Sequence, residues 1–326
     1  MNPQSIIVSG ASGWLGREIL KSTARKTAFG LFRDKAVADA YGSTFAGDLS
    51  DPLRISRLVE QYNNLDLQAD CFIHCAGLAH QPNETQEIKR AMWQTNDIGT
   101  ANALEFCKQV GINKFVYIST IAGYDWTSIE QATEDSKLVP ITEYAKSKIS
   151  AENRVLASPI DSRIIRLATV FGQGDIANFS RLSTLLRKRR FPIPGEGIAR
   201  KSVIPIDTAA SLIAKFATMD KVPYQTINLA LPEAPTLNEI CDCFSRVCKF
   251  PRAPRVPLPA IKALAMIGDC FSTIWEMPFS TNVLNKLTTS TCVNTDRIQT
   301  IFPKELLESF EVSLERHANY YQSLHS

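Results

Sequence analysis

Residues 6–16 read Ile-Ile-Val-Ser-Gly-Ala-Ser-Gly-Trp-Leu-Gly, and this stretch decides the fold. A short apolar run, Ile6–Ser9, ends at the first of three glycines, and a helical pattern follows the third. Gly10 permits a tight turn, Gly13 lets the backbone approach a pyrophosphate, and Gly16 lets helix and strand pack closely. The N-terminus of the helix offers unpaired N–H groups to an anion. The stretch therefore predicts a strand–turn–helix unit that binds a dinucleotide.

Strand and helix patterns alternate through the first two-thirds of the chain. Largely apolar runs without regular alternation predict strands at 29–32, 43–47, 71–75, 115–119 and 163–167. Helical patterns fall at 15–26, 53–62, 85–110 and 144–156. Strands without polar alternation are expected where helices cover both faces of a sheet. The predicted fold class is therefore α/β, with a parallel, doubly wound sheet of the Rossmann type.

The pattern changes after about Val170, where glycines and prolines interrupt the elements. Strands at 202–206 and 226–229 are predicted to return to the main sheet, and helices are predicted at 178–190, 237–247 and 304–324. We therefore predict a dinucleotide-binding domain over 1–170, to which 203–230 returns. The segments 171–202 and 231–326 are predicted to form a smaller, interleaved C-terminal substrate domain.

Composition and charge disfavour two classes of protein. The 326 residues are 44% hydrophobic and 21% charged, and the net charge is only +3. A nucleic-acid-binding protein of this size is expected to carry a concentrated basic face, so no nucleic-acid partner is predicted. The eight cysteines form no CxxC pair, and no histidine stands nearby at metal-ligand spacing. Reduced thiols and no metal site are therefore expected.

The sequence also bears on membrane association. The N-terminus lacks the regions of a secretory signal, and no apolar run reaches the length of a membrane span. The run 258–275 comes closest, but Lys262 and Asp269 interrupt it. A helix packed in the smaller domain is expected there, with attachment to a membrane surface as the alternative. These features predict a cytoplasmic protein without integral membrane association.

The GxxGxxG spacing resembles that of the short-chain dehydrogenase/reductase superfamily, and further matches are typical of its extended members, the NAD-dependent epimerase/dehydratase family. The resemblance covers essentially the whole chain and is most specific over 6–210. It implies a nicotinamide dinucleotide held by Gly10, Ser12, Gly13, Trp14, Leu15, Gly16, Asp48, Leu49, Cys75, Ala76, Gly77 and Asn96. The alternatives are that Asp48 is an ordinary turn residue and that Asn96 only bonds neighbouring backbone.

Arg33 bears on the choice of cofactor. It follows the second predicted strand, where an acid would normally hold the ribose 2′-hydroxyl. A guanidinium at this place can pair with a 2′-phosphate, which favours NADP(H) over NAD(H). Two alternatives stay open: a small register shift brings Asp34 to the ribose, or Arg33 is a solvated loop cation.

Tyr144 and Lys148 form the predicted proton-transfer pair. They stand four residues apart, so they share one face of a predicted helix. A free phenol has a pKa of about 10, and a nearby ammonium is expected to lower it. The resemblance implies that Tyr144 exchanges a proton with the substrate oxygen while Lys148 also holds the nicotinamide ribose. By the same resemblance Thr120 hydrogen-bonds the reacting oxygen, with Ser119 beside it in the substrate site.

Three segments resemble those of enzymes that act on sugar nucleotides. Residues 166–172 match an R-x-x-x-V-F-G pattern at the end of a predicted strand. By resemblance, Asn178 and Arg200 contact a substrate diphosphate, for which a guanidinium fork is well suited. The alternatives are a helix cap for Asn178 and a surface charge for Arg200. The basic run 187–190 is interpreted as a solvated helix end.

Within this family the residues after Thr120 discriminate between reactions. Nucleotide-sugar dehydratases carry Asp-Glu there, whereas this chain has Ile121 and Ala122, which disfavours dehydration. Arg33 favours NADP(H)-dependent reduction of a nucleoside-diphosphate 4-keto-6-deoxy sugar, with Tyr144 as proton donor. The alternatives are an NAD-dependent C4 epimerase of a UDP-sugar, reduction of a non-sugar ketone, and a non-catalytic sensor of NADP. A homodimer is expected by resemblance only.

Overall fold

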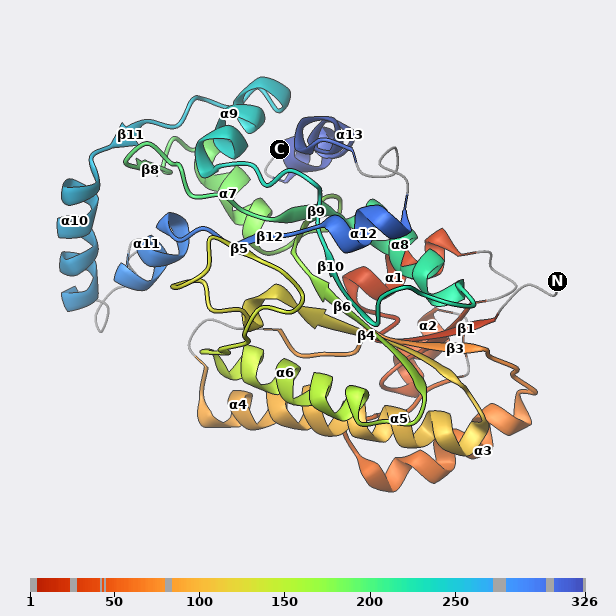
Figure 1. Ribbon diagram of the computed structural model, residues 1–326. Coiled ribbons are helices and arrows are strands. Elements are labelled where there is room, and N and C mark those ends of the chain that lie inside the picture. The colour runs from red at the N-terminus through yellow and green to blue at the C-terminus, as the bar shows by residue number, and fades with distance from the viewer. Residues whose placement is uncertain are drawn as a thin grey trace.

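A computed structural model describes residues 5–23, 28–41, 43, 45–79, 84–271, 280–302 and 308–324. Its main sheet has six strands, all parallel, in the order β10-β6-β4-β3-β1-β2. These strands are β1 (Ile6–Ser9), β2 (Ala28–Leu31), β3 (Cys71–His74), β4 (Lys114–Thr120), β6 (Asp161–Leu167) and β10 (Thr226–Leu229). The predicted α/β fold with a parallel, doubly wound sheet is confirmed (Figure 1).

Helices cover both faces of the sheet (Figure 1). One face carries α1 (Trp14–Ser22), α8 (Ile206–Thr218) and α12 (Asp296–Ile301). The other carries α3 (Ile55–Asn64), α5 (Gly99–Val110) and α6 (Glu143–Leu156). The chain enters α5 from α4 (Gln86–Trp93) through a π-helical turn, Gln94–Ile98, and α2 (Lys35–Ala40) follows β2. Short 3-10 turns occur at Pro52–Arg54 and Ile121–Gly123.

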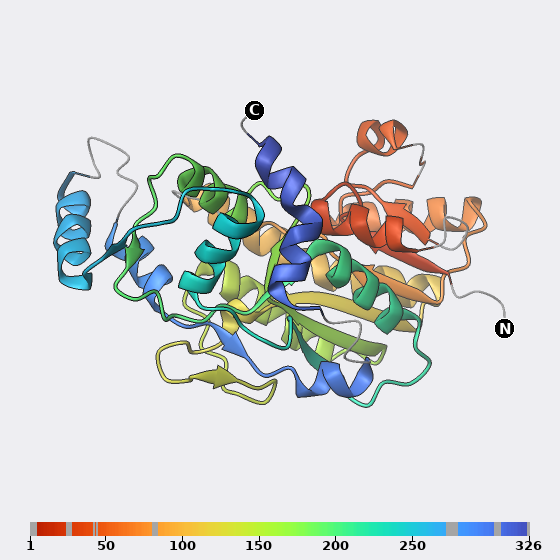
Figure 2. The same cartoon turned by 90° about the horizontal axis from the view of Figure 1, so that it is seen from above.

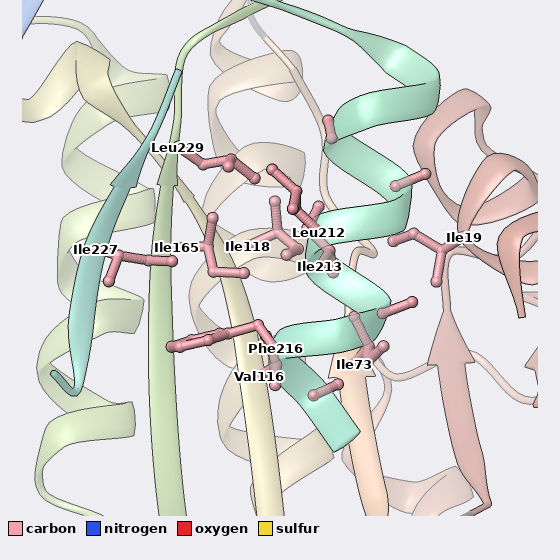
Figure 3. Packing of buried hydrophobic residues seen from close by; sticks show 14 of the residues in the cluster. Ile19, Ile73, Val116, Ile118, Ile165, Leu212, Ile213, Phe216, Ile227 and Leu229 are labelled. Atoms are coloured by element: carbon pink, nitrogen blue, oxygen red, sulfur yellow. The ribbon is translucent and has the colours of Figure 1, made fainter. Parts of the chain in front are cut away.

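Side chains alternate between the two cores with the period of two expected of a strand. Val116 and Ile118 of β4 pack against α8 and α1, whereas Phe115 and Tyr117 pack against α5 and α6. Figure 3 shows the first core, in which Phe216 of α8 lies over the strands. Because both faces are buried, most strand residues are apolar, and the polar ones in β6, such as Arg163 and Arg166, are buried with partners.

One predicted strand is not formed, and another is formed but does not join the main sheet. In 43–47 the described residues make one bridge, Phe32 to Ala46, because β2 ends at Leu31 and presents little more backbone to pair with. The predicted 202–206 strand is β9 (Val203–Pro205), but it pairs with β7 (Thr169–Phe171) in a separate two-stranded sheet. The place beside β6 in the main sheet is taken by β10, so β9 cannot join there.

The smaller part of the chain lies beyond the carboxyl ends of the strands (Figure 2). Its core joins α7 (Asn178–Arg187), α9 (Leu237–Val247) and α13 (Phe310–Ser323). The remaining helices are α10 (Leu258–Phe271) and α11 (Thr281–Thr288), which pack on each other at one end of the molecule. The predicted helices at 178–190 and 237–247 are confirmed, and part of the predicted 304–324 helix falls outside the described residues. None of the described helices is long and apolar enough to cross a membrane.

Residues near the C-terminus pack against the main sheet. Ile298 of α12 and Phe302 are buried in the same core as α8 and β10. Just before them, β12 (Cys292–Val293) pairs with β5 (Gln131–Ala132), and β8 (Ile193–Pro194) pairs with β11 (Arg255–Val256) elsewhere. The division into two interleaved domains stays a prediction, and part of 231–326 packs with the sheet rather than with the smaller part.

Candidate active site

The three glycines form a tight loop that no larger residue fits. Gly10 has a φ of +68°, and a Cβ there would lie 2.8 Å from the backbone nitrogen of Ala76. A Cβ on Gly16 would lie 2.3 Å from the carbonyl oxygen of Gly10. Gly13 caps α1 without a side-chain hydrogen bond, so the N–H groups of the first turn stay available to an anion. The cradle therefore fits a dinucleotide pyrophosphate.

His74 supports this loop and was not predicted as a site residue. Its Nδ1 lies 2.7 Å from the hydroxyl of Ser9, and the same hydroxyl accepts a hydrogen bond of 3.3 Å from the N–H of Ala76. Burial, helped by the charge of Lys148, lowers the pKa of His74 to about 3, so the ring is neutral. Ser9 thus joins the loop after β1 to the loop after β3.

Residues predicted for the adenine end lie in two turns. One carboxylate oxygen of Asp48 accepts from the N–H and the hydroxyl of Ser50, at 2.9 and 2.7 Å. Leu49 is buried in the core, and its carbonyl accepts a 2.7 Å hydrogen bond from Asn102. Asp48 therefore makes the turn that was considered as its alternative role, and its second oxygen has no partner among the described residues.

Arg33 and Asp34 follow β2 and have different environments. The Asp34 carboxylate caps α2 by accepting a 2.9 Å hydrogen bond from the N–H of Val37. Arg33 is exposed, and no hydrogen bond or ion pair to it is found within the described residues. Asp34 is partly engaged by the cap, whereas Arg33 has no partner among the described residues, at the place where the ribose is expected.

Asn96 clamps the loop after β3 to helix α6. Its amide oxygen accepts from the N–H of Leu78 at 2.7 Å, and its amide nitrogen donates to the carbonyl of Leu78 and to the hydroxyl of Ser147, at 3.0 and 2.9 Å. Asn96 lies in the π-helical turn, a distortion often found at functional sites. A Cβ on exposed Gly77 would lie 3.2 Å from this amide oxygen, so a larger residue there would press on the Asn96 side chain.

Thr120 and Tyr144 are brought together as predicted. Thr120 ends β4, and its hydroxyl oxygen accepts a 3.1 Å hydrogen bond from the N–H of Ala122. Tyr144 lies in the first turn of α6, which Thr142 caps, and its phenol lies close enough to the Thr120 hydroxyl for the two to interact. Burial raises the pKa of Tyr144, and the Thr120 hydrogen bond partly offsets this. The phenol is therefore a proton donor rather than a phenolate in this state.

Lys148 contacts a different ring from the one expected. Its ammonium lies 4.2 Å from the centre of the Tyr117 ring, a cation–π contact. The expectation that Lys148 lowers the pKa of Tyr144 is wrong for this state, because burial dominates the phenol and the ammonium lies over Tyr117. Lys148 still faces the cofactor loop, since a Cβ on Gly77 would lie 3.8 Å from its Nζ.

Burial also disfavours the charged form of Lys148. It lowers the pKa of the ammonium from 10.5 to about 8, against the opposing influence of Cys75 and Glu152. The Cys75 thiol is half-buried, and burial raises its pKa to about 12, so it stays protonated at neutral pH. At neutral pH Lys148 is therefore charged although it is buried, and the loss of hydration around the ammonium destabilises the folded protein.

Replacing Lys148 with methionine is expected to raise the free energy of unfolding at pH 7 by up to about 3 kcal/mol, while activity is lost. Between pH 8 and 10.5 the folded wild type binds fewer protons than the unfolded chain, so its stability rises with pH there. The variant lacks this rise. Urea unfolding at pH 7 and pH 10 measures both effects, with exposed Lys146→Met on the same helix as control. Equal pH dependence in wild type and Lys148→Met would contradict the argument.

Ser119 does not point toward the predicted substrate site. It is buried, and its hydroxyl donates a short hydrogen bond to the carboxylate of Glu152, which also pairs with Arg166. A strand residue next to Thr120 points to the opposite face, so Ser119 and Thr120 cannot both face one ligand. Its predicted contact with substrate is therefore wrong in this structure, and the hydroxyl is part of a buried network.

The two predicted diphosphate contacts are both exposed. Asn178 begins α7, but the helix N-terminus is capped by buried Asp175, which accepts from the N–H groups of Ala177 and Ser180 at 2.7 and 2.9 Å. The Asn178 side chain is thus not needed as the cap. Arg200 makes an isolated bridge with Thr236 and donates a 2.9 Å hydrogen bond to the carbonyl of Ala234.

Trp14 ties the glycine loop to the substrate side. Its indole N–H donates a 2.8 Å hydrogen bond to the carbonyl of Gln173, and a Cβ on Gly174 would lie 2.9 Å from the indole nitrogen. The same loop is held from α13, because the hydroxyl of Tyr321 accepts a 2.8 Å hydrogen bond from the N–H of Gly172. Ser12 and Leu15, the other predicted loop residues, are exposed and half-buried.

Comparison with known proteins agrees with this geometry. The sequence matches the model of the NAD dependent epimerase/dehydratase family over residues 6–230. A curated relative, the UDP-glucose 4-epimerase of Vibrio cholerae, is 26% identical over 230 residues, which cover 65% of this chain and 66% of the relative. The chain therefore spans slightly less than two-thirds of that relative.

Solved structures share the fold over nearly the full length. The UDP-glucuronic acid 4-epimerase of Bacillus cereus in complex with NAD has a TM-score of 0.72 and 18% identity, with 99% of this chain and 100% of that chain covered. The dTDP-4-dehydrorhamnose reductase of Bacillus anthracis in complex with NADP has a TM-score of 0.70 and 18% identity, with 97% and 98% covered. With the glycine cradle, the Tyr144–Thr120 contact and a family match across the whole main sheet, the chain belongs to the NAD dependent epimerase/dehydratase family of enzymes.

Proposed function

We propose that this protein uses NADPH to reduce the 4-keto group of a nucleoside-diphosphate 4-keto-6-deoxy sugar. When bound, the nicotinamide nucleotide supplies the hydride. Tyr144 donates the proton to the carbonyl oxygen, which Thr120 orients by a hydrogen bond. Lys148 holds the nicotinamide ribose and stabilises the phenolate that Tyr144 leaves behind. The cofactor pyrophosphate would be held by the loop of Gly10, Gly13 and Gly16, and Cys75, Ala76 and Gly77 in the loop after β3 would contact the cofactor.

The substrate side supports a diphosphate ligand. Asn178 and Arg200 are exposed, and Arg200 leaves part of its guanidinium free for bidentate hydrogen bonds. A diphosphate held away from the reacting carbon positions it for hydride transfer. Dehydration is disfavoured, because Ile121 is apolar and buried and Ala122 carries no acid or base.

The observation that carries the choice of NADP(H) is the free Arg33 beside an engaged Asp34. The cap on α2 uses one oxygen of the Asp34 carboxylate and holds that side chain against the helix N-terminus, which favours Arg33 over Asp34 as the ribose contact. An exposed guanidinium at the end of β2 can pair with a 2′-phosphate. A reductase needs its cofactor to enter and leave, and the phosphate contact suits NADPH.

Arg33→Ser is expected to weaken NADPH binding by about 10- to 100-fold and to leave NADH binding within about twofold, because a charge-assisted contact is worth about 1.5–3 kcal/mol. Dissociation constants for both nucleotides, from the fluorescence of the reduced nicotinamide, measure this. The control is Lys35→Ser, which removes an exposed cation two residues away. An equal loss for NADH and NADPH would mean that Arg33 does not read the 2′-phosphate.

The function is tested first by binding and then by turnover. Thermal shifts with UDP, dTDP, GDP and CDP, each with NADPH or NAD⁺, identify the nucleotide; a ligand at 100 times its dissociation constant stabilises by about 2.7 kcal/mol. The matching 4-keto-6-deoxy sugar should then consume NADPH with one product hydroxyl formed per turnover. Stabilisation by no nucleoside diphosphate would overturn the sugar-nucleotide assignment and favour a non-sugar ketone.

A C4 epimerase of a UDP-sugar is the second candidate, since the Vibrio cholerae relative is a UDP-glucose 4-epimerase. An epimerase keeps its NAD⁺ and returns the hydride to the other face of the sugar. Purified protein that retains NAD⁺ and interconverts two UDP-sugars without net use of NADPH would favour this candidate. The proposal of a reductase expects an empty site that added NADPH fills.

A further inference from the structure

Glu152 and Arg166 form a buried ion pair behind the proposed catalytic groups. Their side chains are 1% and 7% exposed, and Nη2 of Arg166 lies 2.9 Å from Oε2 of Glu152. Nε of Arg166 adds contacts of 3.1 and 3.2 Å to the two carboxylate oxygens. The remaining carboxylate contact is the short hydrogen bond donated by Ser119. The carboxylate is therefore bonded by two strands at once.

These contacts connect the elements that carry the catalytic groups. Glu152 lies one helical turn beyond Lys148 and two beyond Tyr144, on the same side of α6. Ser119 immediately precedes Thr120 on β4. The bond between Ser119 and Glu152 thus fixes the strand that presents Thr120 against the helix that presents Tyr144.

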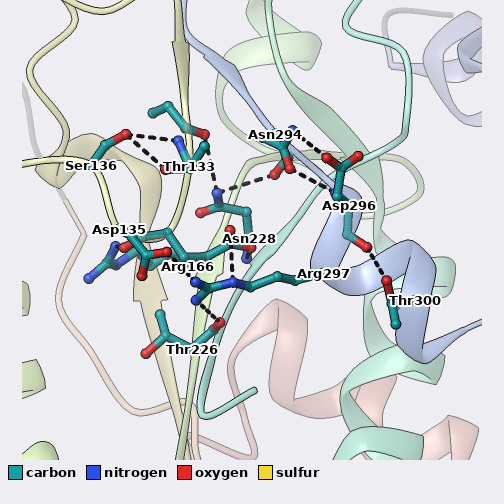
Figure 4. A network of polar contacts seen from close by, with 12 residues as sticks. Thr133, Asp135, Ser136, Arg166, Thr226, Asn228, Asn294, Asp296, Arg297 and Thr300 are labelled. Atoms are coloured by element: carbon teal, nitrogen blue, oxygen red, sulfur yellow. Dashed lines mark hydrogen bonds and ion pairs between the residues drawn. The ribbon is translucent and has the colours of Figure 1, made fainter. Parts of the chain in front are cut away.

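Arg166 anchors the pair from the other side. Its Nη1 donates to the hydroxyl of Tyr124 at 3.0 Å and to the carbonyl of Glu134 at 2.8 Å. The Tyr124 hydroxyl donates a 2.7 Å hydrogen bond to the side-chain oxygen of Asn228 on β10. Figure 4 shows Arg166 beside Asn228, which bonds Asn294 directly and is linked to Arg297 through the Glu134 carboxylate. The guanidinium therefore has little freedom to move relative to the sheet.

Stability alone does not account for such a pair. Removing two charges from water costs several kcal/mol per ion, and replacing buried pairs with packed apolar residues is often neutral or stabilising by about 1–4 kcal/mol. Ser119, Glu152 and Arg166 are all buried, so none of them touches solvent or an exposed ligand. A role in holding neighbouring groups remains.

We infer that the Glu152–Arg166 pair is a positioning device: it sets the separation of Thr120 from Tyr144 and places a fixed negative charge one turn behind Lys148. The inference rests on the proposed roles of those three residues. Glu152 favours the charged form of Lys148, whose other titratable neighbours are Cys75 and His74 from the β3 side and Tyr117 from β4.

The test compares two apolar double variants. Glu152→Met with Arg166→Met removes the buried pair without leaving one charge alone. Arg246→Met with Glu311→Met removes an exposed pair of the same bidentate form, with contacts of 3.1 and 3.0 Å between α9 and α13. We expect the buried double variant to fold with a lower urea midpoint, because Ser119, Tyr124 and the Glu134 carbonyl lose partners, and to lose about 100-fold in kcat with KM within about threefold, since small misplacements cost this much. The exposed double variant should keep both constants.

A second measurement does not need turnover. The pH titration of the Lys148 ¹³Cε resonance, assigned by its loss in Lys148→Arg, is expected to shift to lower pH in Glu152→Gln, which keeps a hydrogen-bond acceptor but removes the charge. Should the buried double variant fail to fold, Ser119→Ala, which cuts only the link to β4, replaces it and should lower kcat by about tenfold. Unchanged kcat in the folded variant together with an unmoved Lys148 titration would overturn the inference. If the wild type shows no turnover but the Lys148 titration is shifted in Glu152→Gln, only the proposed function is contradicted.

Discussion

Tyr144→Phe is expected to lower kcat for keto reduction by about 10²- to 10⁴-fold, the usual worth of a positioned general acid. The ring keeps its place in the first turn of α6, and only the hydroxyl that meets Thr120 is lost. NADPH affinity should stay within about threefold, because the glycine loop and Arg33 are untouched. Single-turnover oxidation of bound NADPH measures the chemical step apart from binding and release.

The control for this experiment is Tyr62→Phe. Tyr62 lies on α3, and its hydroxyl accepts a 2.9 Å hydrogen bond from the N–H of Ala69, away from the site. Its removal should cost about 1 kcal/mol of stability and leave kcat unchanged. Tyr144→Phe with more than a third of the wild-type kcat would assign the proton to another donor. A variant that loses turnover but keeps its role in the cell would favour a sensor of NADP.

Gly16→Ala is expected to weaken nucleotide binding by about 100-fold or more. The new Cβ would lie 2.3 Å from the Gly10 carbonyl oxygen, so the backbone of the cradle must move. A moved cradle loses several charge-assisted hydrogen bonds to the pyrophosphate, each worth about 1.5–3 kcal/mol. The crowding itself should cost about 1–3 kcal/mol of folding stability. Calorimetric titration with NADPH and urea unfolding measure the two losses.

Gly99→Ala is the matched control. Gly99 also begins a helix on the sheet, but a Cβ there would meet nothing closer than 3.6 Å. Alanine should stabilise this helical position by roughly 0.5–1 kcal/mol and leave nucleotide affinity unchanged. If Gly16→Ala binds NADPH as well as Gly99→Ala does, the glycine loop is not the pyrophosphate site.

Sequence patterns predicted the features that depend on neighbouring residues in the chain. The glycine loop at 10–16 is a short-range steric feature, and the helix carrying Tyr144 and Lys148 follows from spacing. The 202–206 strand is formed, but its predicted place in the main sheet is wrong. That place depends on which strand pairs with β6, and this is β10, more than twenty residues later in the chain. Pairing partners of this kind are not encoded in the strand itself.

The site was harder to predict where burial and residues distant in the sequence determine the pKa values and the hydrogen-bond partners. The pKa of Tyr144 depends on its burial and on Thr120, and Lys148 lies over the Tyr117 ring; the spacing of Tyr144 and Lys148 reveals neither. The sequence predicts that Ser119 faces the substrate. It does not reveal that Glu152, paired with Arg166, lies close enough to accept the Ser119 hydrogen bond. Asp34 was left open, and its use as the α2 cap is a local feature that the sequence could have suggested.

The hold of α13 on the loop after β7 has a consequence for how the protein matures. Tyr321 and His317 contact Gly172 and Gln173, about 150 positions earlier in the chain. Domains are generally completed in order as a polypeptide leaves the ribosome. A nascent chain that has already emerged through α8 holds the whole glycine loop, yet its substrate-side loop stays unclasped until the final helix is made. Until α13 is made, the loop at Gly172 and Gln173 therefore lacks the two contacts that hold it beside Trp14.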